Sequence, residues 1–184
     1  MKPIVLDRDG VINVDSDHYI KSAEEWQPIP GSIEAIAALS QAGFHVFVAT
    51  NQSGLGRGLF QTKHLEEMNN KLFSLVERAG GKVTHVEFCP HTPMDNCECR
   101  KPKTGLLTQI EQKFLCSLVN SYFVGDSVRD IQAALSYGCR PVLVKTGKGK
   151  VAVNTLSDLG LSGFLVFEDL AAAADHIIGA ETNE

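Results

Sequence analysis

Short apolar runs alternate along the chain with longer amphipathic segments. Each run is typical of a strand buried on both faces, and together the runs cover residues 4–6, 44–49, 83–88, 122–124, 142–144 and 164–167. Apolar side chains recur with helical spacing between Ser32 and Gly43, from Thr62 to Gly80, and before Gly138. This alternation predicts an α/β fold, a Rossmann-like three-layer arrangement in which helices cover both faces of a parallel sheet.

The length of the chain bounds the number of domains. Its 184 residues with 43% hydrophobic content suffice for one substantial core but not for two. We therefore expect a single domain over residues 1–178, without a separate cap domain, followed by a frayed tail over residues 179–184. Residues 146–150 are expected to form a flexible or anion-facing loop.

The charge pattern and the apolar runs restrict the partners. The formal net charge is −5 at pH 7 and no long run of Lys and Arg occurs, so the basic surface of a nucleic-acid-binding protein is missing. The N-terminal apolar stretch is broken by Asp7, which makes it too short for a signal peptide, and no later run could span a bilayer. We expect a cytoplasmic protein that binds neither nucleic acid nor membrane.

Two carboxylates, Asp7 and Asp9, directly follow the first predicted strand. Ligands of such sheets bind at the carboxyl ends of the strands. Carboxylates at this spacing can divide the work of phosphoryl transfer, because one attacks phosphorus, the other moves a proton, and a divalent cation suppresses their repulsion. The alternative is an Asx-type turn in which Gly10 supplies a positive φ angle. The pair alone does not decide between the two.

The loops after the next strands also carry polar groups. The hydroxyl and amide groups from Thr50 to Ser53 could hold a phosphate, although Thr50 could equally be a turn former. Arg100 and Lys101 precede Pro102, which restrains the backbone, so that a cation held there could offset phosphoryl charge. The alternative is a solvated pair of basic side chains.

The fourth strand ends at Asp126, and Ser127 and Asp130 follow. A parallel sheet would place Asp126 beside Asp7 and Asp9, where two carboxylates and a backbone carbonyl would suffice for Mg²⁺. Asp130 would either support these ligands or simply begin a helix, and the pattern leaves both possibilities open.

The series DRDG, ATNQSG, RKPK and GDSVRD resembles the haloacid dehalogenase-like phosphatases in order and spacing, over most of the chain. The resemblance implies an aspartyl-phosphate mechanism with Asp7 as nucleophile and Asp9 as general acid and then base. It further implies that Thr50 and Lys101 stabilise the transferring phosphoryl group. Asp7, the carbonyl group of Asp9, and Asp126 would bind Mg²⁺.

A second cluster lies in residues 89–99, where Cys89, His91, Cys97 and Cys99 supply three thiolates and one imidazole. Four such groups in one loop, in a chain without export signals, predict a closed tetrahedral zinc site rather than disulfides. A closed site leaves no position for an activated water, so the zinc would be structural and would hold the loop beside Arg100. Free thiols beside a surface histidine are the alternative.

A zinc loop that runs directly into CRKPK resembles a small branch of the same superfamily, the heptose 1,7-bisphosphate 7-phosphatases and the histidinol-phosphate phosphatases. NQSG followed by Arg57 and Gly58, without a second domain, favours the heptose group. That resemblance implies removal of the 7-phosphate on the route to ADP-heptose for the lipopolysaccharide core. Thr104 departs from the usual proline of the branch, which affects only the rigidity of that turn. A zinc-loop interaction module on a catalytically weak scaffold is an alternative of another class.

Without a cap domain, loops must grip the small phosphorylated sugar. Arg100 offers a planar fork suited to hydroxyl groups or to a retained phosphate, whereas His18 could simply be solvated. The expected substrate-binding residues are Asp15, Asp17, His18, Asn51, Gln52, Ser53, Arg57, Arg100 and Ser127. A monomer is expected, and the preferred anomer stays open.

Overall fold

The computed structural model describes residues 1–182 and contains one six-stranded parallel sheet. Its strands are β1 (Lys2–Leu6), β2 (Phe44–Asn51), β3 (Val83–Cys89), β4 (Tyr122–Gly125), β5 (Arg140–Val144) and β6 (Leu165–Phe167). Their order in the sheet is β3-β2-β1-β4-β5-β6. The predicted fold class is confirmed, and each predicted strand is present.

The central strand shows why the sheet is covered on both sides. Ile4, Val5 and Leu6 of β1 are all fully buried. Successive side chains of a strand point to opposite faces, so Ile4 and Leu6 join one apolar cluster and Val5 joins another. The part of a strand that lies between two neighbours, as Ile4 to Leu6 lie between β2 and β4, therefore needs apolar side chains on both faces.

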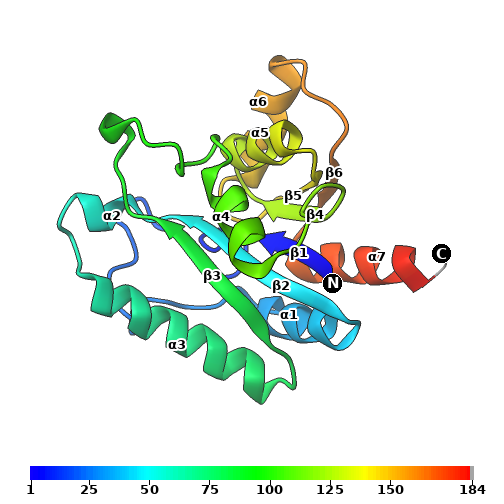
Figure 1. The fold of residues 1–184 in the computed structure, drawn as a ribbon, viewed down its shortest axis with the longest axis horizontal. Coiled ribbons are helices and arrows are strands. Elements are labelled where there is room, and N and C mark those ends of the chain that lie inside the picture. The colour runs from blue at the N-terminus through cyan, green and yellow to red at the C-terminus, as the bar shows by residue number, and fades with distance from the viewer. Residues whose placement is uncertain (183–184) are drawn as a thin grey trace.

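Helices form the outer layers (Figure 1). The helical segments are α1 (Ser32–Gln41), α2 (Ser53–Gly56), α3 (Thr62–Arg78), the 3₁₀ turn η1 (Pro93–Asp95), α4 (Gly105–Phe114), α5 (Val128–Tyr137), α6 (Gly149–Asp158) and α7 (Leu170–Thr182). Helices α1, α3 and α7 pack on the face that carries Ile4 and Leu6, and α4, α5 and α6 pack on the opposite face.

Two segments differ from the sequence-based expectation. The expected loop 146–150 overlaps α6, which begins at Gly149. The tail expected to fray from Gly179 is helical as far as Thr182, because α7 continues through it, and residues 183–184 lie outside the described residues. Helix α7 is apolar around much of its circumference, so it shows little of the amphipathic contrast on which sequence reading depends.

The longest connection, residues 7–31, lies between β1 and α1 and is tied to the fold rather than forming a cap. Trp26 is fully buried, and Lys71 Nζ of α3 donates hydrogen bonds to the carbonyl groups of Ala23 (2.6 Å) and Trp26 (2.7 Å). Within residues 1–182 no second folded unit stands over the carboxyl edge of the sheet. The site at that edge is therefore built from loops.

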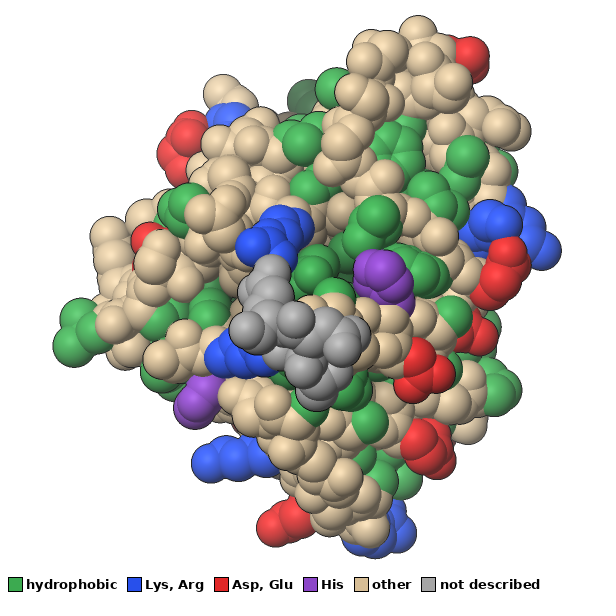
Figure 2. Space-filling model, turned by 90° about the vertical axis from the view of Figure 1, so that its right-hand side faces the viewer, with side chains coloured by type: hydrophobic (Ala, Val, Ile, Leu, Met, Phe, Trp, Pro, Cys, Tyr) green, Lys and Arg blue, Asp and Glu red, His purple; other side chains and the backbone are tan. Residues whose placement is uncertain are grey.

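Charged side chains of both signs are spread over the side of the molecule that Figure 2 shows. Lys and Arg side chains there stand in separate small groups among Asp and Glu side chains. In the described chain, no helix is both long and apolar enough to cross a bilayer.

Candidate active site

The turn after β1 brings two acidic side chains to the carboxyl edge of the sheet. The Asp7 amide donates to the Val124 carbonyl (2.8 Å) and so continues the β1–β4 pairing. Gly10 has a φ angle of 85°, and a Cβ atom there would lie 2.1 Å from Asp126 Oδ2. Only glycine meets both demands, so the turn can close against the loop after β4.

Lys101 reaches this edge from the loop after β3. Its side chain is 3% exposed, and Nζ lies 2.8 Å from Asp7 Oδ1, 2.7 Å from Asp130 Oδ1 and 2.7 Å from the Ala49 carbonyl oxygen. Burial alone would lower the pKa of Lys101, but the carboxylates of Asp130 and Asp7 outweigh it and raise that pKa. Lys101 is therefore a fixed cation beside Asp7.

Asn51 holds Lys101 in place through the backbone. Asn51 Nδ2 donates to the Lys101 carbonyl (3.1 Å), and the Lys101 amide donates to Asn51 Oδ1 (3.1 Å). Asn51 was expected to bind substrate. Its side-chain amide instead forms both of these hydrogen bonds with Lys101, although Asn51 also lines the cavity.

Three carboxylates form a cluster that includes both acidic partners of Lys101. Asp7, Asp126 and Asp130 each place an oxygen within 4.8 Å of the others. Burial and the charge of Asp130 raise the pKa of Asp7 to about 7, although Lys101 opposes the shift. Burial and the charges of Asp7 and Asp130 raise the pKa of Asp126 to about 8. One lysine leaves an excess of negative charge, and the oxygen donors suit the hard cation Mg²⁺.

Asp130 begins a helix and also contacts the buried lysine. Its Oδ2 atom accepts hydrogen bonds from the Ser127 amide (3.0 Å) and the Ser127 hydroxyl (2.6 Å), which completes a capping box at the start of α5. Its Oδ1 atom pairs with Lys101. The helix start therefore also orients the lysine.

Asp9 has a different environment from Asp7. Asp9 Oδ1 accepts from Arg8 Nη2 (3.0 Å) and Asn13 Nδ2 (2.9 Å), while Oδ2 accepts from Arg8 Nη2 (3.1 Å) and Gln52 Nε2 (2.7 Å). Burial would raise the pKa of Asp9, but the Arg8 charge and the hydrogen bonds from Asn13, Arg8 and Gln52 lower it overall. Gln52 Nε2 also donates to Thr50 Oγ1 (2.9 Å). The two environments thus shift the pKa values of the two aspartates in opposite directions.

These groups form the floor of a cavity of about 390 Å³. Every predicted catalytic and Mg²⁺-binding residue lines it, together with the predicted substrate-binding residues Asp15, Asp17, Asn51, Gln52, Ser53, Arg57, Arg100 and Ser127. His18 does not. The turn in which the Tyr19 amide donates to the Ser16 carbonyl (3.0 Å) brings Tyr19 and Ile20 to the cavity and leaves His18 exposed.

Several residues of this site were not named as site residues from the sequence, among them Arg8, Asn13, Arg129 and Lys148. Lys148 Nζ lies 3.2 Å from Asp15 Oδ2 and 3.7 Å from Asp17 Oδ1, and its amide donates to Asp126 Oδ2 (2.8 Å). Part of the loop expected to face an anion therefore does line the cavity. The position of Arg8 between two aspartates in DRDG could have indicated an ion pair within the turn.

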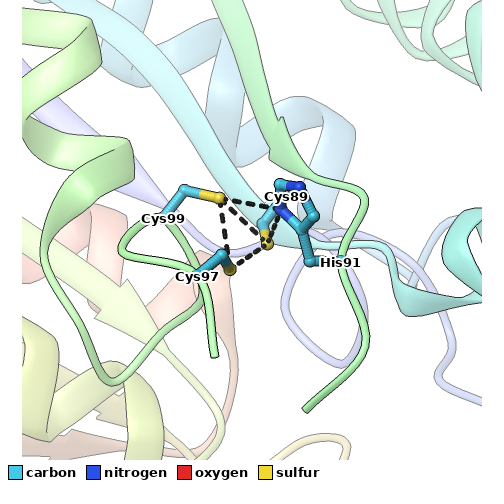
Figure 3. A group of neighbouring side chains, drawn as sticks. All are labelled: Cys89, His91, Cys97 and Cys99. Atoms are coloured by element: carbon cyan, nitrogen blue, oxygen red, sulfur yellow. Dashed lines mark hydrogen bonds between the residues drawn. The ribbon is translucent and has the colours of Figure 1, made fainter. Parts of the chain in front are cut away.

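The zinc-type cluster is assembled after β3 (Figure 3). Cys89 ends the strand and is fully buried, while Cys97 and Cys99 return toward it from the far side of the loop. Cys99 Sγ lies 3.2 Å from Cys89 Sγ, 3.5 Å from Cys97 Sγ and 3.2 Å from His91 Nδ1. All four ligand atoms lie within 4.8 Å of one another, which fits one tetrahedral ion.

Comparisons with known proteins identify relatives of this chain. Residues 98–173 match the HAD-hydrolase-like family model. The chain is 53% identical to the D-glycero-beta-D-manno-heptose-1,7-bisphosphate 7-phosphatase of Pseudomonas putida, over 97% of this chain and 100% of that protein. It is 54% identical to the same-named protein of Pseudomonas aeruginosa, over 95% of this chain and 97% of that one. The chain belongs to the heptose bisphosphate phosphatase family.

A solved member of the heptose bisphosphate phosphatase family shares the whole architecture. The crystal structure of D,D-heptose 1,7-bisphosphate phosphatase from B. bronchiseptica, complexed with magnesium and phosphate, superposes with a TM-score of 0.92. It is 47% identical, and the match covers 98% of this chain and 99% of that one. As a heptose bisphosphate phosphatase family member, this protein is a hydrolase of phosphoric monoesters.

Proposed function

We propose that this protein removes the 7-phosphate of D-glycero-beta-D-manno-heptose 1,7-bisphosphate through a phospho-aspartyl intermediate. The observation that carries the proposal is Asp7, buried at the cavity floor, with Lys101 Nζ 2.8 Å from its oxygen. The names of the relatives indicate the substrate and its beta anomer. The proposal includes a place in ADP-heptose synthesis for lipopolysaccharide, action as a single-domain monomer, and a cytoplasmic location.

Each residue of the floor has one role in the proposed reaction. An Asp7 oxygen forms a bond to phosphorus as the bond to the sugar oxygen breaks, and Asp9 gives that oxygen a proton. Asp9 then takes a proton from water as the water oxygen attacks phosphorus and the Asp7–phosphorus bond breaks. Lys101 and the Thr50 hydroxyl stabilise the charge of the transferring group.

We further propose that Asp7, Asp126 and the Asp9 carbonyl hold Mg²⁺, with Asp130 beside them. The three clustered carboxylates, whose charge Lys101 only partly balances, support this assignment. When bound, the ion would neutralise charge on the phosphoryl oxygens. The related phosphatase from B. bronchiseptica was crystallised as a complex with magnesium and phosphate, which also supports the choice of metal.

The four residues of the zinc-type cluster are proposed to hold one structural Zn²⁺. Burial raises the pKa of the Cys89 thiol to about 12, so thiol protons must leave when the metal binds. Arg100 Nη1 donates to the His91 carbonyl (3.3 Å), which links the cluster directly to the cavity.

Changing Cys97 to Ser is expected to reduce bound zinc from about one equivalent to less than about half, because a hydroxyl is a poor fourth ligand. Loosening the loop should also lower kcat/KM through Arg100 and Lys101. Elemental analysis of protein purified without chelators measures the first effect, and phosphate release measures the second. Cys116→Ser, outside the cluster, is the matched control and should retain its zinc. Full zinc in Cys97→Ser would argue against the four-ligand site.

Substrate choice depends on the rim of the cavity. Arg100 and Arg129 both line it, and burial together with the charge of Arg129 lowers the pKa of Arg100, which places the two guanidinium groups within electrostatic range. A heptose bisphosphate keeps one phosphate while the other is removed. We propose that Arg100, with Arg129, binds the phosphate that is retained.

Arg100→Met is expected to lower kcat/KM for the heptose bisphosphate by ~10-fold to 100-fold, equivalent to about 1.5–3 kcal/mol for a charge-assisted hydrogen bond. Turnover of an aryl monophosphate should stay nearly unchanged because it has no second phosphate. Lys103→Met removes an exposed cation from the same loop and serves as control. Equal losses on both substrates would instead assign Arg100 to the transferring phosphate.

A panel of sugar phosphates and histidinol phosphate, assayed with Mg²⁺, tests the proposed function directly. The highest kcat/KM is expected for the heptose bisphosphate. A preference for histidinol phosphate would overturn the substrate but not the phosphatase chemistry. Loss of turnover for every phosphate ester would favour the zinc-loop interaction module.

A further inference from the structure

Arg8 is a deeply buried charged side chain next to the proposed reaction centre. It is 1% exposed, although it stands between two aspartates in the sequence. Its carbonyl group accepts hydrogen bonds from the amides of Ile12 (2.8 Å) and Asn13 (3.1 Å), so the chain folds back over it. The guanidinium group is therefore held at one place in the turn rather than free in solvent.

The charge of Arg8 is directed at Asp9. Nη2 contacts both Asp9 oxygens, at 3.0 and 3.1 Å, whereas Nε and Nη1 have no hydrogen-bond partner in the described residues. A buried guanidinium with so few partners is unfavourable unless a carboxylate balances it. Arg8 and Asp9 thus depend on each other.

Gln52 completes the contact from the neighbouring strand. Its Nε2 atom has two hydrogens and donates to Asp9 Oδ2 (2.7 Å) and Thr50 Oγ1 (2.9 Å). Gln52 is 5% exposed, so it has little freedom to turn elsewhere. It connects the proposed proton donor after β1 with the proposed phosphoryl ligand at the end of β2.

We propose that Arg8 and Gln52 are positioning residues that aim the Asp9 carboxyl group at the leaving oxygen and at the attacking water. This inference rests on the proposed function, because it assumes that Asp9 transfers the proton. Neither residue touches the phosphoryl group in this scheme. Their effect should therefore follow the need for proton transfer and not the binding of substrate.

The two half-reactions separate this role from a general structural one. A sugar alkoxide leaves poorly without a proton, whereas nitrophenolate leaves readily without one. The kcat/KM value reports the steps up to departure of the leaving group, and kcat also includes hydrolysis of the intermediate. A misdirected Asp9 should therefore slow the first step for the sugar alone and the second step for both substrates.

Arg8→Met is expected to lower kcat/KM for the heptose bisphosphate by ~10-fold to 100-fold, which is a fraction of the loss expected when a general acid is removed altogether. For p-nitrophenyl phosphate, kcat/KM should fall by less than about threefold. The variant should also show a burst of nitrophenolate approaching one equivalent of enzyme, because hydrolysis of the intermediate becomes slow. Arg8→Lys should recover part of the loss, since it restores a cation that reaches Asp9. Arg78→Met, an exposed arginine of α3, is the matched control.

Gln52→Met should show the same selectivity and burst, so the inference can be tested even if Arg8→Met does not fold. Equal losses of kcat/KM on both substrates without a burst would overturn it. The proposed function fails separately, through an inactive wild type or an active Asp7→Asn variant. If both of those controls behave as expected and the selectivity is absent, only the positioning role is wrong.

Discussion

Asp7→Asn is expected to abolish turnover of every phosphate ester, by a factor of ~10⁴ or more, while the fold stays intact. The amide has nearly the shape of the carboxylate but cannot attack phosphorus, and no other carboxylate can simply replace it in the covalent step. Phosphate release, followed with enough enzyme to detect slow turnover, measures the loss. Activity within tenfold of the wild type would exclude Asp7 as the nucleophile.

In the absence of metal, Asp7→Asn should be at least as stable as the wild type. The difference between their unfolding free energies should depend on pH. Burial and Asp130 raise the pKa of Asp7 from 3.8 to about 7 in the folded protein, so the folded state holds a proton that the unfolded state loses. The unfolding free energy of the wild type therefore falls as pH rises from about 4 to about 7, and asparagine removes this contribution. At pH 8 we expect the unfolding free energy of Asp7→Asn to exceed that of the wild type by on the order of 2 kcal/mol. Urea unfolding of both proteins in EDTA measures the difference.

Asp9→Asn is expected to lower kcat/KM for the heptose bisphosphate by ~10²-fold to 10⁴-fold, because leaving-group protonation is lost. Unlike Asp7→Asn, it should also destabilise the protein. Removing the carboxylate leaves the Arg8 guanidinium buried without its counter-charge, and the new amide group must face donors from Arg8, Asn13 or Gln52. We expect the unfolding free energy to fall by about 2–3 kcal/mol. This is less than the usual cost of breaking a fully buried ion pair, because the Asp9 side chain is 20% exposed.

The double variant Arg8→Met/Asp9→Asn provides the control for this loss. If the destabilisation comes from the uncompensated charge of Arg8, removing that charge should restore most of the unfolding free energy but none of the activity. Additive losses of stability in the two single variants would mean that Arg8 and Asp9 are not coupled. Urea unfolding of the four proteins at one pH measures the coupling.

The opposite expectations for Asp7 and Asp9 show where sequence reading was sufficient and where it was not. The spacing of the two carboxylates at the end of an apolar run predicted that both would reach the carboxyl edge of the sheet. It could not predict that Asp7 lies in an excess of negative charge, or that Arg8 beside Asp9 is buried and that Gln52 joins it at Asp9. Those environments depend on Asp130 and Gln52, which are distant in the sequence.

For several loop residues, too, the role suggested by the sequence differs from the contacts in the structure. Asn51 and Gln52 look like ligand-binding amides in the sequence, but their side chains bond to Lys101 and Asp9. His18 looks like a ligand in a polar loop, but the local turn leaves it exposed. Lys148 belongs to the loop expected to be flexible or to face an anion, yet its Nζ atom lies beside the carboxylate of Asp15.

The amino-acid sequence alone was enough to predict the succession of strands, the layered fold, the acidic strand ends and the four residues of the zinc-type cluster. These features are local, because an apolar run, a turn glycine or a closely spaced ligand set can be recognised without knowing its neighbours. Which polar groups face the cavity, and which hold other side chains in place, became visible only in the folded arrangement. The role of each polar side chain depends on contacts among loops that are distant in the sequence and meet at one edge of the sheet. Burial and neighbouring charges there set its protonation state.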